Sequence, residues 1–294
     1  MLVVNLIGGI GNQMFQYASA WALASEHGME LKLDISDFHR FPPRRYLLDH
    51  FRVDAAIAQP DELERFDKDS NRIRSATRKL VARLRGDNRV TGRTIFERGF
   101  PWQKIALDPA VDTLLIGYWQ SERYFSALAH QVRQAFTLKA PPDARAQRLL
   151  DDIDRHPAVS IHVRRGDYVS NPVVQKKHGL VGLDYYAAAV AHILRLEPQA
   201  KFYIFSDDMD WVRANLPIAA PVEYVDLNGP DQPHEDLRLM TRCRHHIVAN
   251  SSLSWWGAWL NPNPEKVVIA PRQWFTPKSR RDARDIVPLD WVRI

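Results

Sequence analysis

The chain has 294 residues, of which 45% are hydrophobic and 26% charged, a composition typical of a soluble globular protein. Its formal net charge of +5 suits an anionic substrate or an anionic membrane surface as well as it suits nucleic acid. Cys243 is the single cysteine, which excludes an intramolecular disulfide and indicates a reducing compartment. No apolar run reaches transmembrane length, and glycines follow the run 2–7 where a signal peptide would continue, so we expect a cytoplasmic protein.

The first segment predicts a βαβ unit. An apolar strand over 2–7 leads into a glycine-rich turn over 8–13, a helix to about His27 and a strand over 31–34. Gly28 stands where a helix stop is expected. Further along, a basic stretch over 64–98 carries a modest apolar stripe at helical spacing, and 114–119 is typical of another buried strand.

The second half repeats the alternation of strands and helices. A polar stretch over 140–143 leads into a helix to about Asp154. We then expect strands at 159–163, 202–205, 222–225 and 247–249, separated by helices at 184–196, 208–215 and 235–243. This order predicts an α/β protein of two facing Rossmann-like domains with mostly parallel sheets. We place the N-terminal domain at 1–145, on the acceptor side, and the C-terminal, donor-binding domain at 146–294.

The clearest functional motif follows the strand at 159–163. Arg164, Arg165 and Asp167 come directly after it, and His162 lies near its carboxyl end. Ligands of α/β sheets bind at the carboxyl ends of strands, and the planar arginine fork matches a phosphate group. A surface charge cluster is the alternative, but the strand context favours a site for a charged, nucleotide-like substrate.

The glycine turn over 8–13 is a second candidate ligand contact. Gly9 and Gly11 fit half of the dinucleotide fingerprint, whereas Met14 stands at the position of its third glycine. Glycines at a helix N-terminus let backbone N–H groups approach a ligand, and Asn12 adds an amide donor there. The alternative is a tight turn that only packs the strand on the helix.

Two carboxylates follow the predicted strand 202–205. Asp207 and Asp208 are positioned to cap the next helix or to accept hydrogen bonds from the N–H edge of guanine. A third interpretation is that Asp208 and Asp210 hold a divalent metal together with substrate phosphates. The sequence favours capping or base recognition over metal binding.

The last motif follows the strand at 247–249. Asn250, Ser251 and Ser252 come at the start of a helix, where small polar residues either cap the helix or offer donors to a phosphate. The tryptophans that follow have helical spacing, which favours a place in the core over stacking on a sugar: Trp255, Trp256 and Trp259.

Together these motifs resemble the α-1,2-fucosyltransferases of bacterial surface-polysaccharide synthesis. The resemblance rests on 8–17, 162–168 and 250–256, with shorter stretches at 170–172, 178–179 and 183–186, and it runs in order from residue 5 to about 275. It implies a GT-B fold, GDP-β-L-fucose as donor, inverting transfer to the 2-hydroxyl of a galactose-type acceptor, and no metal cofactor. The alternatives are another nucleotide sugar on the same fold, or a non-enzymatic binder of anionic polymers.

The resemblance also implies roles for single residues. Arg164 is expected to hold the donor pyrophosphate, and Asn12 to reach in from the first domain. The other residues of the expected donor site are His162, Asp207 and Asp208 near the guanosine, Ser251 and Ser252 at the β-phosphate, and Gly9, Gly11, Arg165 and Asn250. Asp167 and His178 are the candidates for the base, although a loose transition state needs little base.

The basic stretch over 64–98 matches no motif of this family. A solvated surface helix is one interpretation. Because acceptors in surface-polysaccharide assembly are commonly lipid-linked, the other is peripheral docking on an anionic membrane, to which each Lys or Arg contributes roughly 1 kcal/mol. We expect a nucleotide sugar and a glycan acceptor as partners, and no nucleic acid.

Overall fold

The structure is a computed structural model that describes residues 1–40, 44–69, 91–229 and 231–294. The chain forms two compact units, Met1–Thr137 and Leu138–Ile294, which are described one at a time. The boundary expected at 145/146 falls inside helix α6 (Ala144–Asp154), which Asp143 caps through bonds from the N–H groups of Arg145 and Ala146. This helix therefore belongs wholly to the second unit.

The first unit is built on a parallel five-stranded sheet in the order β3-β2-β1-β5-β4. The predicted βαβ opening is confirmed: α1 ends at Gly28, whose φ of 62° is the left-handed conformation expected of a helix-terminating glycine. The elements are β1 (Leu2–Asn5), α1 (Ile10–His27), β2 (Leu31–Asp34), α2 (Ser36–Arg40), β3 (Ala56–Ile57), α3 (Pro60–Leu63), β4 (Arg93–Phe96), β5 (Thr113–Ile116), α5 (Ala129–Ala135) and short 3₁₀ turns at Leu48–His50, Glu122–Tyr124 and Ser126–Leu128.

The basic stretch is described only at its two ends. Residues 70–90, which carry the stripe of Ile73, Leu80, Val81 and Leu84, lie outside the described residues. The end of the stretch is the strand β4 rather than helix. Three of its basic side chains contact the first unit itself: Arg65 pairs with Asp112 at 3.0 Å, Lys68 with Asp34 at 2.6 Å, and Arg93 donates to the Ala106 carbonyl at 3.2 Å.

The second unit is built on a parallel six-stranded sheet in the order β11-β10-β9-β6-β7-β8. Counted from β6 as first strand, this is the Rossmann order 3-2-1-4-5-6, whose topological switch point lies between β6 and β9. The elements after α6 are β6 (Ala158–Val163), α7 (Gly166–Ser170), α8 (Pro172–His178), α9 (Leu183–Leu196), β7 (Lys201–Ser206), α10 (Met209–Asn215), β8 (Val222–Tyr224), α11 (Pro233–Arg242), β9 (His245–Ile247), α12 (Ser252–Leu260), β10 (Val268–Ala270), a 3₁₀ turn at Pro277–Ser279, and β11 (Val292–Arg293).

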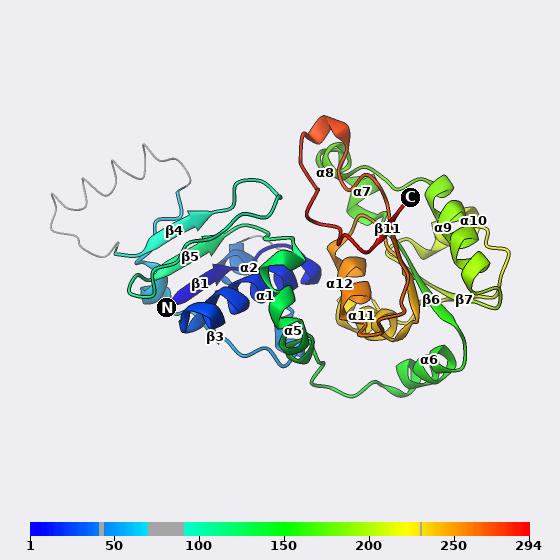
Figure 1. Cartoon of the computed structure of the whole chain (residues 1–294), viewed down its shortest axis with the longest axis horizontal. Coiled ribbons are helices and arrows are strands. Elements are labelled where there is room, and N and C mark those ends of the chain that lie inside the picture. Colours follow the sequence, from blue (N-terminus) through cyan, green and yellow to red (C-terminus); the bar gives the residue numbers. More distant parts are fainter. Residues whose placement is uncertain (41–43, 70–90, 230) are drawn as a thin grey trace. The chain divides into compact units, whose positions relative to one another are not determined.

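Helices cover both faces of this second sheet (Figure 1). On one face, side chains of α9 and α10 pack against alternate residues of the strands, among them Val159, Ile161 and Ile204. On the other face, α6 and α11 pack against Ala158, Tyr203 and Phe205. All six residues of β6 are therefore buried, as expected for a parallel strand covered on both sides.

The tryptophans of α12 confirm the core interpretation of their spacing. Trp255 and Trp256 are fully buried with ring centroids 5.0 Å apart, and the Trp255 indole donates to the Ile286 carbonyl at 2.8 Å. Cys243 is a buried free thiol at the end of α11. Among the described residues, no helix has both the length and the apolar character needed to cross a bilayer.

Candidate active site

Two of the predicted motifs meet at the switch point of the second sheet. β6 ends at Val163 and the chain turns into α7, while β9 ends at Ile247 and the chain turns into α12. The Tyr168 hydroxyl donates to the Asn250 carbonyl at 3.1 Å, which ties the two turns together. The structure thus brings the arginine motif and the serine-bearing motif to the edge where α/β sheets bind ligands.

Arg164 lies between two carboxylates at this edge. Its Nη1 is 2.8 Å from Asp207 Oδ2, and its Nη2 pairs with Asp167. Burial alone would lower the pKa of the guanidinium, but the two carboxylates outweigh burial and raise it. The side chain keeps 23% of its surface exposed. Arg164 is therefore a fixed, partly accessible positive charge, and Asp167 orients Arg164 rather than Arg165.

Arg165 points into the second unit instead. Its guanidinium carbon lies 3.6 Å from the centroid of the Trp211 ring, and its Nε donates to Asp208 Oδ2 at 2.9 Å. Asp208 also caps α10 by accepting from the Trp211 N–H, which confirms the helix-cap interpretation. Asp207 and Asp208 are thus each paired with an arginine, Asp207 with Arg164 and Asp208 with Arg165. Asp207 also accepts the Arg165 backbone N–H at 2.8 Å.

Gly166 makes this arrangement possible. A Cβ added at Gly166 would lie 2.3 Å from Asp207 Oδ2 and 3.1 Å from its carboxyl carbon. A side chain at this position would thus displace the carboxylate that holds Arg164. The sequence placed Gly166 in the motif without giving it a role, since nothing local indicates which side chain approaches from β7.

His162 is almost completely buried beside this pair, at 3% exposure. Burial lowers the pKa of its imidazole to about 4; the charge of Asp207 opposes this shift and that of Arg164 adds to it. The ring is therefore neutral at pH 7. Its Nδ1 has no hydrogen-bond partner among the described residues, and a buried nitrogen of this kind is normally satisfied by a ligand or a water.

His178 reaches the same edge from the end of α8. Its ring stacks on Tyr168 with centroids 4.9 Å apart, and burial lowers its pKa to about 4, with the charge of Arg281 contributing. Because Tyr168 gives its proton to the Asn250 carbonyl, its hydroxyl oxygen accepts from His178 Nδ1 at 3.2 Å. The tautomer that satisfies both contacts has its proton on Nδ1 and a lone pair on Nε2.

The side chains of Asn250 and Ser251, which the sequence offered as possible helix caps, do not cap α12. Ser251 occupies the N-cap position, but its side chain does not cap the helix. The Asn250 amide donates instead to the carbonyls of His178 and Trp274, at 2.9 and 3.2 Å. Asn250 thus joins α8 to the turn before α12, and the N-terminus of α12 lies at the switch point, where a helix dipole favours negative charge.

The glycine turn occupies the corresponding place in the first unit. Gly9 precedes α1 as its N-cap, Gly11 lies in the first turn, and Asn12 Oδ1 accepts from Gln120 at 2.8 Å. Gly8, which the sequence did not single out, has a φ of 79°, and a Cβ there would lie 2.5 Å from Asn12 Nδ2. The predicted site residues thus divide into this group in the first unit and the larger group in the second.

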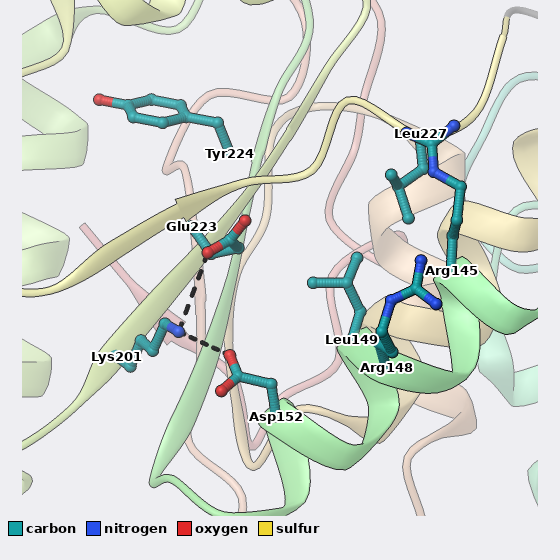
Figure 2. A pocket seen from close by; sticks show the side chains of 8 residues that line it. All are labelled: Arg145, Arg148, Leu149, Asp152, Lys201, Glu223, Tyr224 and Leu227. Carbon is teal, nitrogen blue, oxygen red and sulfur yellow. Dashed lines mark hydrogen bonds and ion pairs between the residues drawn. The ribbon is translucent and has the colours of Figure 1, made fainter.

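A cavity of about 320 Å³ lies elsewhere in the second unit, between α6 and the edge strand β8 (Figure 2). None of the predicted site residues lines it. Lys201 is 2.6 Å from Asp152 and 3.9 Å from Glu223, so its charge is compensated. Across the described part of the chain, no group of three or more His, Cys, Asp or Glu side chains is arranged to hold a metal ion.

The fold defines the class of protein. The structure resembles that of a mutant of Arabidopsis thaliana FUT1 in complex with GDP, with a TM-score of 0.50 and 11% identity over 98% of this chain and 74% of that chain. Parallel α/β units with this likeness give the chain a GT-B-like fold. The prediction of the fold class is confirmed.

The sequence then identifies the family. Residues 97–294 match glycosyl transferase family 11, and the chain belongs to this family. It is 33% identical to the Escherichia coli alpha-1,2-colitosyltransferase over all of this chain and 99% of the relative. It is 30% identical to the E. coli O-antigen biosynthesis glycosyltransferase WbnK, over 94% of this chain and 95% of the relative. The bovine galactoside 2-alpha-L-fucosyltransferase SEC1 is 26% identical over 88% of this chain and 64% of the relative.

Proposed function

We propose that this glycosyltransferase moves L-fucose from GDP-β-L-fucose to the 2-hydroxyl of a galactose-type residue in a surface glycan, with inversion and without a metal. The observation that carries the proposal is Arg164, a fixed positive charge at the switch point of a Rossmann-ordered sheet beside the N-terminus of α12. Relatives that are named for α-1,2 transfer and for O-antigen biosynthesis support the linkage and the acceptor class.

The charge changes of the reaction agree with these groups. Cleavage of the bond between sugar and phosphate builds positive charge on the sugar and negative charge on the departing GDP. Preorganised donors aimed at such a leaving group are typically worth ~3–4 kcal/mol each. In the proposal, Arg164 and the N-terminus of α12 bind the pyrophosphate, and neutral His162 with Asp207 and Asp208 borders the guanosine.

His178 is the better of the two base candidates. Asp167 is occupied by its ion pair with Arg164, whereas His178 Nε2 has a lone pair at neutral pH. Its low pKa makes the imidazole a weak base, which suits a loose transition state in which the acceptor hydroxyl loses its proton late. In the proposal, the side-chain amide of Asn12 contacts substrate.

A second donor has its own support. The E. coli colitosyltransferase is 33% identical over the whole chain. Colitose is L-fucose without its 3-hydroxyl, so the two donors differ by one hydrogen-bonding group. A site that binds this hydroxyl through buried polar atoms rejects the deoxy sugar strongly, by up to ~10⁴-fold, whereas a site without such atoms discriminates weakly.

The test is transfer from GDP-fucose and from GDP-colitose to β-galactoside acceptors, with the linkage of each product determined by NMR. We expect a higher kcat/KM for GDP-fucose and an α-1,2 product, and no product from Arg164→Gln. A tenfold preference for GDP-colitose would show that colitose, and not fucose, is the donor sugar. A different linkage in the product would contradict the acceptor assignment. Binding to nucleic acid without transfer would contradict the enzymatic function.

We also propose that the acceptor is lipid-linked and that the stretch 64–98 docks the enzyme on an anionic membrane surface. Electrostatic docking weakens as salt rises, because exposed charges are screened. Cosedimentation with anionic liposomes should therefore decrease with salt, and should decrease when Arg74, Arg78 and Arg83 become Gln. Equal partition of wild type and variant would show that the stretch does not dock.

A further inference from the structure

Glu97 follows strand β4 and holds the turn that comes after the neighbouring strand β5. It lies directly after β4, and its two carboxylate oxygens accept the backbone N–H groups of Tyr118 and Trp119 at 2.7 and 2.9 Å. These two residues come just after β5, the neighbour of β4 in the sheet. A single carboxylate thus fixes two consecutive peptide groups at the carboxyl edge of the first sheet.

The same turn is held from its other side by α1. Gln16 donates to the Gly117 carbonyl at 3.0 Å, and Ser19 donates to the Trp119 carbonyl at 3.2 Å. Trp119 is fully buried with a φ of 54°, a conformation that side-chain-bearing residues adopt only when their surroundings hold them there. Gly117 has no room for a side chain, since a Cβ would lie 2.3 Å from the Cβ of Glu97.

The next residue of the turn contacts the candidate site. Gln120 Nε2 donates to Asn12 Oδ1 at 2.8 Å. This contact fixes the orientation of the Asn12 amide, because a side-chain amide that accepts through its oxygen presents its NH₂ elsewhere. Glu97, the turn 117–119, Gln120 and Asn12 therefore form a continuous chain of contacts within the first unit.

We infer that Glu97 is a positioning residue for the substrate-binding edge of the first sheet, because it holds the turn that orients Asn12. The inference rests on the proposed function for the claim that Asn12 touches substrate. It goes beyond that function by assigning the orientation to a carboxylate that itself does not contact Asn12.

The charge of Glu97 decides how well it holds the turn. An ionised carboxylate accepts both N–H groups, whereas a protonated one presents a hydroxyl to one of them and loses that bond. Burial raises the pKa of Glu97 to about 7, and the two backbone hydrogen bonds only partly oppose this shift. The turn is thus fully held only above about pH 7.

Among the described residues, no neighbouring charge contributes to the raised pKa of Glu97. α1 faces the turn with Gln16 and Ser19, and the chain after β5 contributes backbone N–H groups. The basic residues nearest in sequence, Arg93 and Arg98, are exposed, and Arg93 is engaged with the Ala106 carbonyl. The titration of Glu97 is therefore set by its own burial rather than by a neighbouring charge.

The direct test is NMR of the whole chain, with wild type and Glu97→Gln compared between pH 5.5 and 8.5. In wild type, the Asn12 side-chain amide and the Trp119 backbone N–H should shift with a midpoint near 7; in Glu97→Gln these shifts should be absent. Glu26→Gln, an exposed change on α1, is the matched control and should retain them. An Asn12 amide that does not respond to pH in wild type would overturn the inference.

Kinetics supply the second readout. With transferase activity in hand, kcat/KM of wild type should rise through pH 7, and Glu97→Gln should be about tenfold lower at pH 8 and should lack this rise. An unchanged pH profile in the variant would mean that Glu97 acts only on folding, and would overturn the positioning role. If instead wild type transfers no sugar from either donor, the proposed function fails, whereas the NMR titration still decides the inference.

Discussion

Replacing Gly166 by alanine tests the arrangement around Arg164 with a single methyl group. The new Cβ would lie 2.3 Å from Asp207 Oδ2, about 1 Å closer than ordinary van der Waals contact. The carboxylate must move, and it then gives up its 2.8 Å interactions with the Arg164 guanidinium and the Arg165 backbone N–H. The backbone itself is not strained, because Gly166 is the first residue of α7 and its φ is not positive.

The expected cost follows from the displacement of this carboxylate. Overpacking a well-packed site typically costs ~1–3 kcal/mol, and near 150 residues each kcal/mol lowers Tm by roughly 2–4 °C. We therefore expect Gly166→Ala to lower Tm by roughly 2–12 °C. We also expect it to reduce affinity for GDP about tenfold, because Arg164 is no longer held in place. Differential scanning calorimetry and isothermal titration with GDP measure the two effects.

A double-mutant cycle can refute this reasoning. In an Asp207→Ala background the carboxylate is absent, and only the Cβ at 207 remains, at an ordinary 3.8 Å. Gly166→Ala should then be neutral or slightly stabilising, because alanine is the better helix former. Gly229→Ala, which would meet nothing within 4 Å, is the control. An equal destabilisation by Gly166→Ala in both backgrounds would show that Asp207 is not what the methyl group displaces.

Three further predictions concern the same site. Arg164→Lys should lose most activity in steady-state assays, since a point charge cannot replace the planar fork. Arg165→Lys should have a milder effect, because Arg165 stacks on Trp211 inside the unit. Near-wild-type turnover of Arg164→Lys would contradict the assignment of Arg164. Excess EDTA should leave activity largely intact, and complete loss restored by Mn²⁺ or Mg²⁺ would assign Asp208 and Asp210 to a metal. Because burial holds the pKa of His178 near 4, its imidazole stays neutral above about pH 5, so His178→Gln should lower kcat without removing any limb of the pH profile between 6 and 8.

The repeating pattern of the sequence was sufficient to predict most of the fold. The apolar run 159–163 and the glycine at 28 indicate elements through local rules, and the structure has β6 and the end of α1 at those places. The strand β4 was missed because it lies in a stretch dominated by basic residues. β10 was also missed, although the apolar run over 267–270 is of the same kind as the runs that indicated β8 and β9.

The contacts of the site were less predictable than its location. Strand ends predict which residues gather at one edge, but they do not indicate which side chains pair across 40 or more positions. Arg165 reaches Asp208, and Asp207 reaches Arg164, only through the pairing of β6 with β7. Glu97 carried no signal at all, because a glutamate after a short strand gives no indication of the turn it will hold.

We expect a bound diphosphate to displace Asp167, rather than Asp207, from Arg164. Both sides of the guanidinium fork are occupied, by Asp167 and by Asp207. Asp207 is also held by the Arg165 backbone N–H, whereas Asp167 lies on the five-residue helix α7 and is 34% exposed. We expect Asp167 to move more easily because it is the more exposed of the two carboxylates, at 34% against 27%. Asp167→Asn should tighten GDP binding a few-fold in titration calorimetry, and Asp207→Asn should weaken it. The reverse order would mean that the phosphate displaces Asp207 and contacts the Asp207 side of the guanidinium.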